Sequence, residues 1–471
     1  MRELWTESEL AGVLGPPTAR LVDAVNGVSI DSRTLRAGDL FFAIKGETHD
    51  GHDHVAAAFE AGAAAAVVAR EHAHSLLSFG PTFAVDDTLK GMERLAAAAR
   101  ARTRARIVAV TGSVGKTSVK EMLRVMLASC RATHASAASY NNQWGAPLTL
   151  ARLARDADYA VVEIGMNHAG EITPIVGLAR PHAAIVTTIA PVHIEYLGSI
   201  EAIADAKAEI FSGVEPGGTA VLNRDAPQFE RLKRAAKARG LILVTFGASE
   251  GCDARLVEFS ADDRGGRVGA RILKRDIAFD LGAPGRHMAE NAVGALLVAH
   301  ALGADVRACA AALAEFSPQK GRGERFSIPT PGGSAMIIDE SYNANPASMR
   351  AALALLGAAK PGLKGRRIAV IGDMLELGPK GAEMHAALAA DLAANRVDLL
   401  FGAGPLTRAL FDAAPPSMRG AWAERAAELV EEVARELRDG DVIMVKGSNG
   451  SRMGPLVAAL RGRFARVAAD G

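Results

Sequence analysis

The residues whose types and spacing suggest chemistry most clearly form one glycine-rich run, which follows an apolar segment and precedes a helical one. They are Gly112, Ser113, Val114, Gly115, Lys116, Thr117 and Ser118. Glycines let backbone N–H groups turn toward a phosphate, and a helix N-terminus adds partial positive charge. The lysine reaches the terminal phosphates and the threonine hydroxyl can bind Mg²⁺. The run predicts a nucleoside triphosphate site, although it matches a shortened version of the full phosphate-loop pattern, with Gly112 as its first glycine.

Two polar residues near the ends of later predicted strands could complete this site. Glu163 ends the strand predicted within 159–166, and a carboxylate there could hold the metal of a nucleoside triphosphate. His193 lies just beyond the strand predicted at 183–189. Taken singly, a strand-end glutamate is more often a solvated rim residue, and a lone histidine is more often structural. Both gain weight because they fall at successive strand ends beside the phosphate loop.

Four further positions carry chemically useful groups but have ordinary alternatives. Lys207 lies in a helical pattern that by itself favours an exposed lysine. Arg322 could contact a phosphate across a cleft, and a solvated loop explains it equally well. Asp339 ends a predicted strand, and the turn-forming residues that follow it are typical of a plain loop. The run 446–452 combines cations with amide donors, which suits a carboxylate ligand.

The elements that must position these residues fall into three segments. Residues 1–85 combine short strands with an alanine-rich helix and predict a small α/β domain. Residues 86–316 alternate strands and helices, as parallel sheets with crossover helices do, except for an antiparallel hairpin predicted within 253–280. Residues 317–471 alternate again, and each predicted strand ends in a glycine or polar turn. We therefore predict an α/β fold of three domains with these limits.

Composition excludes several classes of protein. The 471 residues are enough for about three domains, and 54 Lys plus Arg against 53 Asp plus Glu leave a net charge of +1. This balance gives no global attraction to nucleic acid or anionic lipid. Three scattered cysteines favour a reducing compartment, and the longest apolar stretch (61–69) is too short to cross a bilayer. We expect a cytoplasmic protein that binds no nucleic acid and does not insert into membranes.

Together with the phosphate loop, seven longer motifs resemble those of the Mur ligase family, the ATP-dependent amide-forming enzymes of peptidoglycan precursor synthesis. They are YNNQWGAPLTL (140–150), VVEIGMNHAGEI (161–172), HIEYLGSIEAIADAKAEIF (193–211), ENAVGALLVA (290–299), DESYNANPASM (339–349), VIGDMLELG (370–378) and VKGSNGSRM (445–453). The resemblance covers nearly the whole chain. It implies a UDP-binding domain, a central ATPase domain with a parallel sheet and a Rossmann-like C-terminal domain, in the order of the three segments.

The resemblance also implies roles for individual residues. Ser32 and Arg33 match contacts to the UDP-sugar, and Asn141 and Asn142 match a loop between ATP and the nucleotide-linked peptide. The residues matched to magnesium ligands are Thr117, Glu163 and His193. The residues matched to the grip on the nucleoside are Asn291, Asp339 and Asn343, with Arg322 on a phosphate. Lys207 matches a lysine that is carbamylated in the family, which replaces its interpretation as an exposed lysine and adds it to the catalytic and metal-binding groups.

The runs YNANPASM and GDMLELG are similar to those of the family member that adds D-alanyl-D-alanine to UDP-N-acetylmuramoyl-tripeptide. This similarity implies amide formation through an acyl phosphate with ATP and Mg²⁺, in a protein that we expect to act as a monomer. One alternative is a sister ligase that adds a single amino acid, although its usual Asp-Asn-Pro-Arg motif is missing here. Another is a nucleotide-switch ATPase, which the near-neutral charge disfavours. The third peptide residue and the base for the dipeptide amine stay open.

Overall fold

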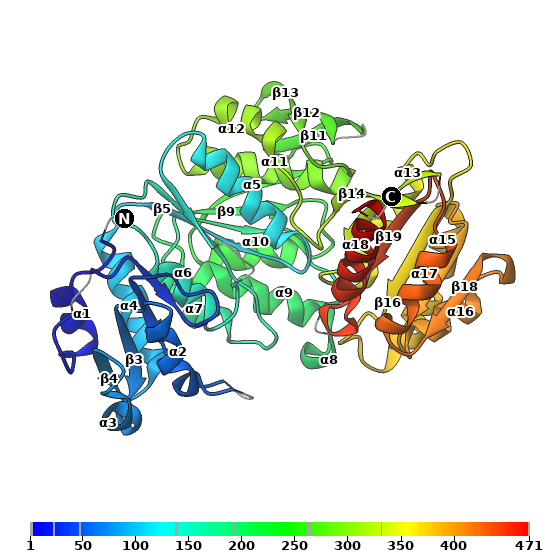
Figure 1. Ribbon diagram of the computed structural model, residues 1–471. Coiled ribbons are helices and arrows are strands. Elements are labelled where there is room, and N and C mark those ends of the chain that lie inside the picture. The colour runs from blue at the N-terminus through cyan, green and yellow to red at the C-terminus, as the bar shows by residue number, and fades with distance from the viewer. Residues whose placement is uncertain are drawn as a thin grey trace.

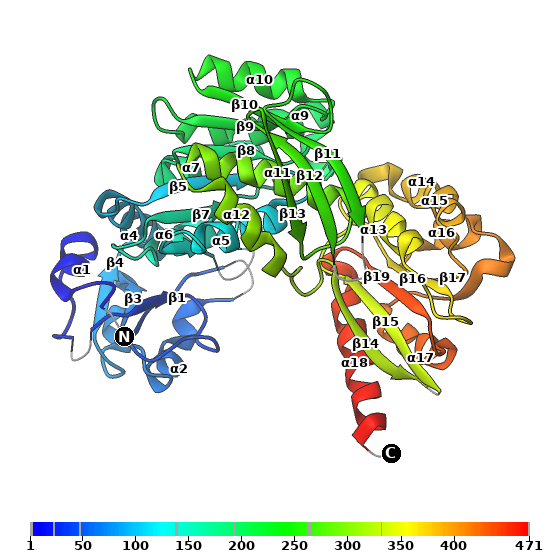
Figure 2. The same ribbon diagram turned by 90° about the horizontal axis from the view of Figure 1, so that it is seen from above.

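The part of the chain that the structure describes is built on three β-sheets that follow one another along the sequence (Figure 1). The computed structural model describes residues 3–21, 24–46, 49–136, 140–192, 194–261, 265–330 and 332–469. We call the elements around the three sheets the first unit (α1 to β4), the central unit (α4 to α12) and the third unit (β14 to α18). Figure 2 shows the first and third units on opposite sides of the central one. No described helix is long and apolar enough to cross a membrane.

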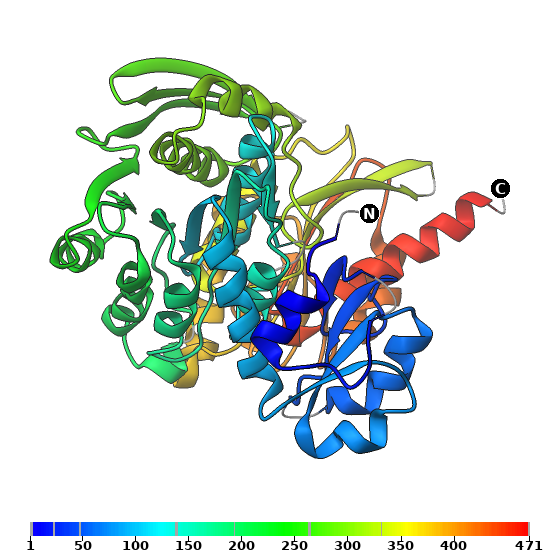
Figure 3. The same ribbon diagram turned by 90° about the vertical axis from the view of Figure 1, so that its left-hand side faces the viewer.

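The first unit has four parallel strands in the order β1-β2-β3-β4. These strands are β1 (Gly27–Ser29), β2 (Asp39–Phe42), β3 (Ala65–Ala69) and β4 (Thr82–Val85), with helices α1 (Glu7–Leu14), α2 (Val55–Glu60) and α3 (Ala73–Leu76). In Figure 3 this unit is nearest the viewer. Its core includes Phe83 and Val85 packed with Met92 and Leu95 of α4 (Thr88–Arg102). Ala96 of α4 packs instead in the core of the central sheet, so this helix joins the two units.

The central sheet has nine strands in the order β13-β12-β11-β10-β9-β8-β5-β7-β6. They are β5 (Arg106–Thr111), β6 (Thr133–Ala135), β7 (Tyr159–Glu163), β8 (Ala183–Val186), β9 (Thr219–Asn223), β10 (Ile242–Gly247), β11 (Ala254–Ala261), β12 (Gly266–Ile272) and β13 (Arg275–Leu281). Strands β6 to β11 pair in parallel, as the alternation of strands and helices predicts. Side chains alternate along β5, so Val108 and Val110 pack on one face, and Ile107 and Ala109 on the other.

Helices cover both faces of this central sheet. The helices on one face are α5 (Lys116–Ala128), α11 (Arg286–Ala301) and α12 (Val306–Ala312). Those on the opposite face are α4, α6 (Gly145–Ala151), α7 (Ile172–Ala179), α9 (Ile200–Ala208) and α10 (Phe229–Ala238), with the short α8 (Ile194–Leu197) beside them. The arrangement makes this unit a sheet that is buried on both sides, which explains its near-continuous apolar strands.

The predicted antiparallel hairpin is present as β11 and β12, but the structure adds a third antiparallel strand, β13. The second turn consists of Leu273 and Lys274, whose φ angles are +47° and +70°. Two-residue hairpin turns with positive φ usually carry Asn or Gly, and neither is present here. The sequence therefore offered no turn signal for this strand.

The third sheet has the order β14-β15-β19-β16-β17-β18 and is parallel except for β14. Its strands are β14 (Glu324–Thr330), β15 (Gly333–Glu340), β16 (Arg367–Gly372), β17 (Leu399–Ala403), β18 (Arg419–Ala423) and β19 (Val442–Lys446). Its helices are α13 (Pro346–Ala358), α14 (Gly381–Ala386), α15 (Leu388–Ala394), α16 (Thr407–Ala413), α17 (Val430–Glu436) and α18 (Met453–Ala469). The predicted alternation of strands and helices accounts for β15, β16, β17 and β19, while the edge strands β14 and β18 were not predicted. The α/β, three-part fold class is confirmed, and the predicted limits near 85 and 316 fall between sheets.

Candidate active site

The glycine-rich run forms a turn between β5 and the N-terminus of α5. Gly112 and Gly115 have φ angles of +148° and +88°, which L side chains rarely adopt. A Cβ on Gly112 would also collide with the hydroxyl of Thr187. That hydroxyl donates to the carbonyl of Val114 at 2.6 Å, and the Ser113 hydroxyl donates to the carbonyl of Ala190 at 3.0 Å. The segment that follows β8 therefore holds the loop in place.

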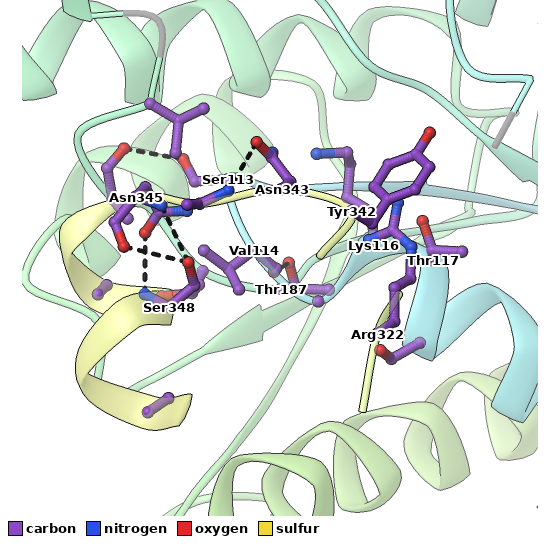
Figure 4. Close-up of a pocket in the computed structure, with 18 of the residues that line it drawn as sticks. Ser113, Val114, Lys116, Thr117, Thr187, Arg322, Tyr342, Asn343, Asn345 and Ser348 are labelled. Carbon is purple, nitrogen blue, oxygen red and sulfur yellow. Dashed lines mark hydrogen bonds between the residues drawn. The ribbon is translucent and has the colours of Figure 1, made fainter. Parts of the chain in front are cut away.

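A cavity of about 650 Å³ lies between this loop and the third unit (Figure 4). The predicted site residues that line it are Ser113, Val114, Gly115, Lys116, Thr117, Ser118, Asn141, Glu163, Asn291, Arg322 and Asn343. They come from strand ends and loops of the central and third units and from helices α5 and α11, although the first and last of them lie more than 200 positions apart in the sequence. Sequence reasoning missed other lining residues, among them His287 and Glu340. A lone histidine in the first turn of a helix gave no signal, and Glu340 was hidden within the DESYNANPASM motif.

Cationic groups converge on the phosphate loop from both units. The Lys116 ammonium donates to the carbonyl of Gly112 at 2.7 Å. Burial lowers the pKa of Lys116, nearby Arg322 lowers it further, and Glu163 opposes both. The Arg322 guanidinium lies 4.0 Å from the ring centre of Tyr342, so the ring helps to aim it (Figure 4). Two cations so close together repel each other, and a bound polyphosphate would stabilise them.

Glu163 has the surroundings of a metal ligand. It is 1% exposed, and its Oε1 accepts from the Thr117 hydroxyl at 3.1 Å and from the Asn141 amide at 2.7 Å. Its Oε2 is buried and has no hydrogen-bond partner among the residues that the structure describes. A buried carboxylate oxygen without a partner is costly, and a hard cation would satisfy it. Glu163 and Thr117 therefore fit Mg²⁺, while His193, the third predicted ligand, lies outside the described residues.

Lys207 lies near the end of α9 and is buried. Ser199 begins this helix by accepting from the backbone of Ala202 at 3.1 Å, and Lys207 follows two turns later at 1% exposure. The exposed position that the helical pattern alone favours is therefore wrong. Burial, with the charge of Lys116 nearby, puts the pKa of Lys207 well below its usual value. A lowered pKa favours the neutral amine, which is the form that reacts with CO₂.

Asp339 holds together two loops of the third unit. It is 1% exposed, and its carboxylate accepts from the backbone N–H of Gly321 and of Ser341, each at 3.1 Å. These loops carry Arg322 and Tyr342 into the cavity. In this structure the Asp339 carboxylate thus faces backbone amides, and its predicted contact with a nucleoside stays a prediction.

Asn291 and Asn343 approach the cavity from opposite sides. A Cβ on Gly115 would lie 2.9 Å from the Asn291 amide nitrogen, so α11 presents this side chain against the phosphate loop. Asn343 uses its side-chain oxygen to accept from the backbone of Ala344 at 2.9 Å, and its carbonyl accepts from the Lys446 ammonium at 2.9 Å. The Lys446 ammonium also pairs with Glu340 at 3.3 Å, so the run 446–452 begins inside the site.

His287 lies at the start of α11 and faces these third-unit charges. Desolvation lowers the pKa of His287, the charge of Lys446 lowers it further, and the charge of Glu340 opposes both. Lys446 and Glu340 form the ion pair on this side of the cavity, next to this imidazole.

The predicted contacts to the UDP-sugar lie in the first unit, away from the residues that line the cavity. Ser32 and Arg33 follow β1, and the guanidinium of Arg33, 86% exposed, pairs with Asp31 at 2.8 Å. Asn142 accepts from the backbone of Gly145 at 2.9 Å and so begins α6. Of the two predicted loop asparagines, Asn141 reaches the cavity and Asn142 supports a helix.

Family models cover most of the described chain. Residues 24–109 match the catalytic domain of the Mur ligase family, residues 110–299 match the Mur ligase middle domain, and residues 321–449 match the Mur ligase glutamate ligase domain. The order of these matches is the order of the three sheets.

Relatives of known sequence and structure agree with this assignment. The chain is 34% identical to the UDP-N-acetylmuramoyl-tripeptide–D-alanyl-D-alanine ligase of Escherichia coli (strain K12), over 97% of this chain and 98% of the relative. It is similar to the crystal structure of MurF from Acinetobacter baumannii, with a TM-score of 0.82, 28% identity and coverage of 97% and 99%. The fold is also that of a MurF ligase from Thermotoga maritima solved with ADP (TM-score 0.76, 24% identity, coverage 94% and 98%). The chain belongs to the Mur ligase family.

Proposed function

We propose that the chain joins D-alanyl-D-alanine to UDP-N-acetylmuramoyl-tripeptide with ATP, through an acyl phosphate, as a step of peptidoglycan precursor synthesis. The Escherichia coli relative, which matches nearly the whole length of the chain, carries that activity in its name. The observation that carries the proposal is the cavity in which the phosphate loop of the central unit faces Arg322 of the third unit. A site shared by two units can bring an activated carboxyl group and an amine together away from water.

The first chemical step would use the cations at the phosphate loop. The tripeptide carboxylate attacks the γ-phosphorus of ATP, a new P–O bond forms, and the bond to the β-phosphate oxygen breaks to release ADP. Lys116 and Arg322 would neutralise the charge that spreads over the transferring oxygens. The predicted nucleoside contacts for this step are Asn291, Asp339 and Asn343, and the loop residues Gly112, Ser113, Val114, Gly115 and Ser118 would cradle the phosphates.

The second step forms the amide. The neutral amine of the dipeptide attacks the acyl carbon, phosphate leaves with the bonding electron pair, and the amine loses its extra proton to a base. We propose that Ser32 and Arg33 hold the UDP end of the other substrate, while Asn141 and Asn142 lie along its path to the cavity. Because water would hydrolyse the acyl phosphate, contact between the central and third units protects this step.

We propose that Thr117 and Glu163 hold Mg²⁺, together with His193 and a carbamate on Lys207. When bound, Mg²⁺ would supply positive charge to the phosphoryl and acyl oxygens. The unpartnered oxygen of Glu163 and the depressed pKa of Lys207 support this assignment. We further propose a cytoplasmic monomer, which size-exclusion chromatography with light scattering tests directly.

A phosphate-release assay tests the proposed function. ATP turnover should require both UDP-N-acetylmuramoyl-tripeptide and D-alanyl-D-alanine, and mass spectrometry should find the pentapeptide product. Turnover that uses UDP-N-acetylmuramoyl-dipeptide and a single amino acid would instead support the sister ligase. Turnover that needs neither substrate would support an ATPase and overturn the proposal.

A further inference from the structure

Leu375 presents an apolar side chain to the cavity from the third unit. It follows β16, is 38% exposed, and lines the same cavity as the phosphate loop. A single exposed leucine is ordinary on a protein surface. What distinguishes Leu375 is how firmly the chain around it is fixed.

The backbone that carries Leu375 is tied to the scaffold on both sides. The N–H of Met374 donates to Nε2 of the buried His385 at 2.8 Å, and the N–H of Leu375 donates to the Ser448 hydroxyl at 3.0 Å. The N–H of Ser448 in turn donates to the carbonyl of Asp373 at 2.9 Å. These bonds join the ends of β16 and β19 and leave the leucine little freedom to turn away.

Two backbone features set the direction of this side chain. Glu376 has φ of +62°, a left-handed conformation that costs a non-glycine residue energy and persists where the surroundings impose it. A Cβ on Gly450 would lie 2.7 Å from Cδ1 of Leu375, so the leucine rests on the bare backbone of that glycine. One side of Leu375 is thus covered, and the other is left open to the cavity.

The seam between the units lies next to this leucine. The carbonyl of Glu376 accepts from the backbone N–H of Glu195 in the central unit at 3.4 Å. Pro191 and Val192, from the segment that leads to it, line the same cavity. Leu375 therefore belongs to the part of the third unit that contacts the central unit. The contact lies close to the strand ends around the phosphate loop.

We propose that Leu375 is a specificity-determining residue that contacts a methyl group of the incoming D-alanyl-D-alanine. The inference rests on the proposed function and goes beyond it, because it names the residue that distinguishes acceptors by their side chains. D-alanyl-D-alanine differs from glycine-containing dipeptides only in its methyl groups, so an apolar contact is the chemistry available for that distinction. One methylene in an apolar pocket is worth about 10- to 200-fold in discrimination.

The test compares D-alanyl-D-alanine, D-alanyl-glycine and glycyl-D-alanine as acceptors. The wild-type protein should prefer D-alanyl-D-alanine to at least one glycine-containing dipeptide by about tenfold or more in kcat/KM. Leu375→Ala should reduce that preference to about threefold or less, mainly through the KM of the acceptor, and leave the KM of ATP and of the UDP-tripeptide unchanged. Leu375→Met, which keeps an apolar side chain of similar size, should retain the preference.

Two further variants separate specificity from folding. Leu363→Ala removes a leucine that is fully exposed and is not among the cavity-lining residues, so it should change nothing. Gly450→Ala should displace Leu375 and reduce the preference as Leu375→Ala does. An unchanged preference in Leu375→Ala, or an equal loss of kcat/KM with all three acceptors, would overturn the inference. If the wild-type protein does not use D-alanyl-D-alanine, the proposed function itself is overturned. This outcome is measured on the wild-type protein alone.

Discussion

The two walls of the cavity are built in different ways. In the central-unit wall the phosphate loop is one continuous run, 112–118, whose shape follows from local geometry at two glycines and a helix N-terminus. The third-unit wall is assembled from separate loops tied by long-range hydrogen bonds. Among these bonds are that of Lys446 to Asn343, 103 positions away, and that of Leu375 to Ser448, 73 positions away.

This difference matches the tasks that the two walls would perform. A phosphate is the same in every ATP-dependent reaction, so a short backbone loop is enough to bind it. An amine acceptor varies between members of a ligase family, and a wall made of separate loops can change one side chain at a time. The variants below remove one contribution from each wall, beginning with the largest expected loss.

Lys116→Ala removes the central wall's main cation. We expect turnover to fall by about a thousandfold or more, because a charge at the transferring phosphoryl group is worth several kcal/mol. Circular dichroism and the melting temperature should stay close to wild type. Lys90→Ala, which removes a lysine from an exposed ion pair with Glu93, is the control and should keep full activity. Near-normal turnover in Lys116→Ala would show that this wall does not bind the transferring phosphate.

Lys207, which is not among the cavity-lining residues, tests whether the central unit also carries a modified lysine. Lys207→Ala should lose about a hundredfold or more in rate, on the scale of losing one preorganised electrostatic group, and added short carboxylic acids should restore part of it. Lys207→Arg should also fail, since a guanidinium keeps the charge but cannot form a carbamate. Bicarbonate-dependent activity of the wild-type protein is the second measurement. Wild-type rates in Lys207→Arg would show that Lys207 acts only as a buried cation and not as a carbamate.

The contrast between the walls also explains what the sequence could predict. The strand–glycine–helix pattern at 106–128 is local, so the phosphate loop and its neighbours were predictable, and so was the parallel core of the central sheet. The burial of Lys207 depends on what packs over α9, which a helical pattern does not contain. Edge strands such as β14 and β18, and a turn such as Leu273-Lys274, carry no strong signal because tertiary pairing fixes them.

Asp339→Asn tests how the third-unit wall positions its cation, Arg322. The substitution turns an acceptor oxygen into a donor that faces a backbone N–H, which costs about 1 to 3 kcal/mol. If the carboxylate acts by aiming Arg322, calorimetry should show ATP affinity falling about tenfold while adenosine affinity holds. Equal losses for ATP and adenosine would instead support the predicted contact with the nucleoside. Asp280→Asn, in an exposed pair with Arg267, should change neither affinity.

The smallest expected effect comes from His385, which supports the third-unit wall through a hydrogen bond with the backbone of Met374. Its Nε2 accepts from the N–H of Met374, its Nδ1 donates to the carbonyl of Gly381 at 2.6 Å, and burial lowers the pKa of His385. The folded pKa thus lies below the unfolded value of about 6.5. Stability from this group is complete above pH 6.5 and is lost as the pH falls toward the folded pKa, by at most about 1.4 kcal/mol per pH unit.

His385→Gln offers an amide oxygen to the same N–H and cannot titrate in this range. The melting temperature of the wild-type protein should therefore fall more steeply between pH 7 and pH 5 than that of His385→Gln. The KM of the wild-type protein for D-alanyl-D-alanine should rise over the same pH range, because Leu375 follows Met374.

His182 of the central unit, whose Nδ1 accepts from the N–H of Ile107 at 2.9 Å, is the matched site. Burial lowers the pKa of His182 as well. His182→Gln should flatten the melting curve with pH but leave the acceptor KM alone, since it supports β5 and not the acceptor loops. An acceptor KM that responds equally to both substitutions would show that the two walls are not independent.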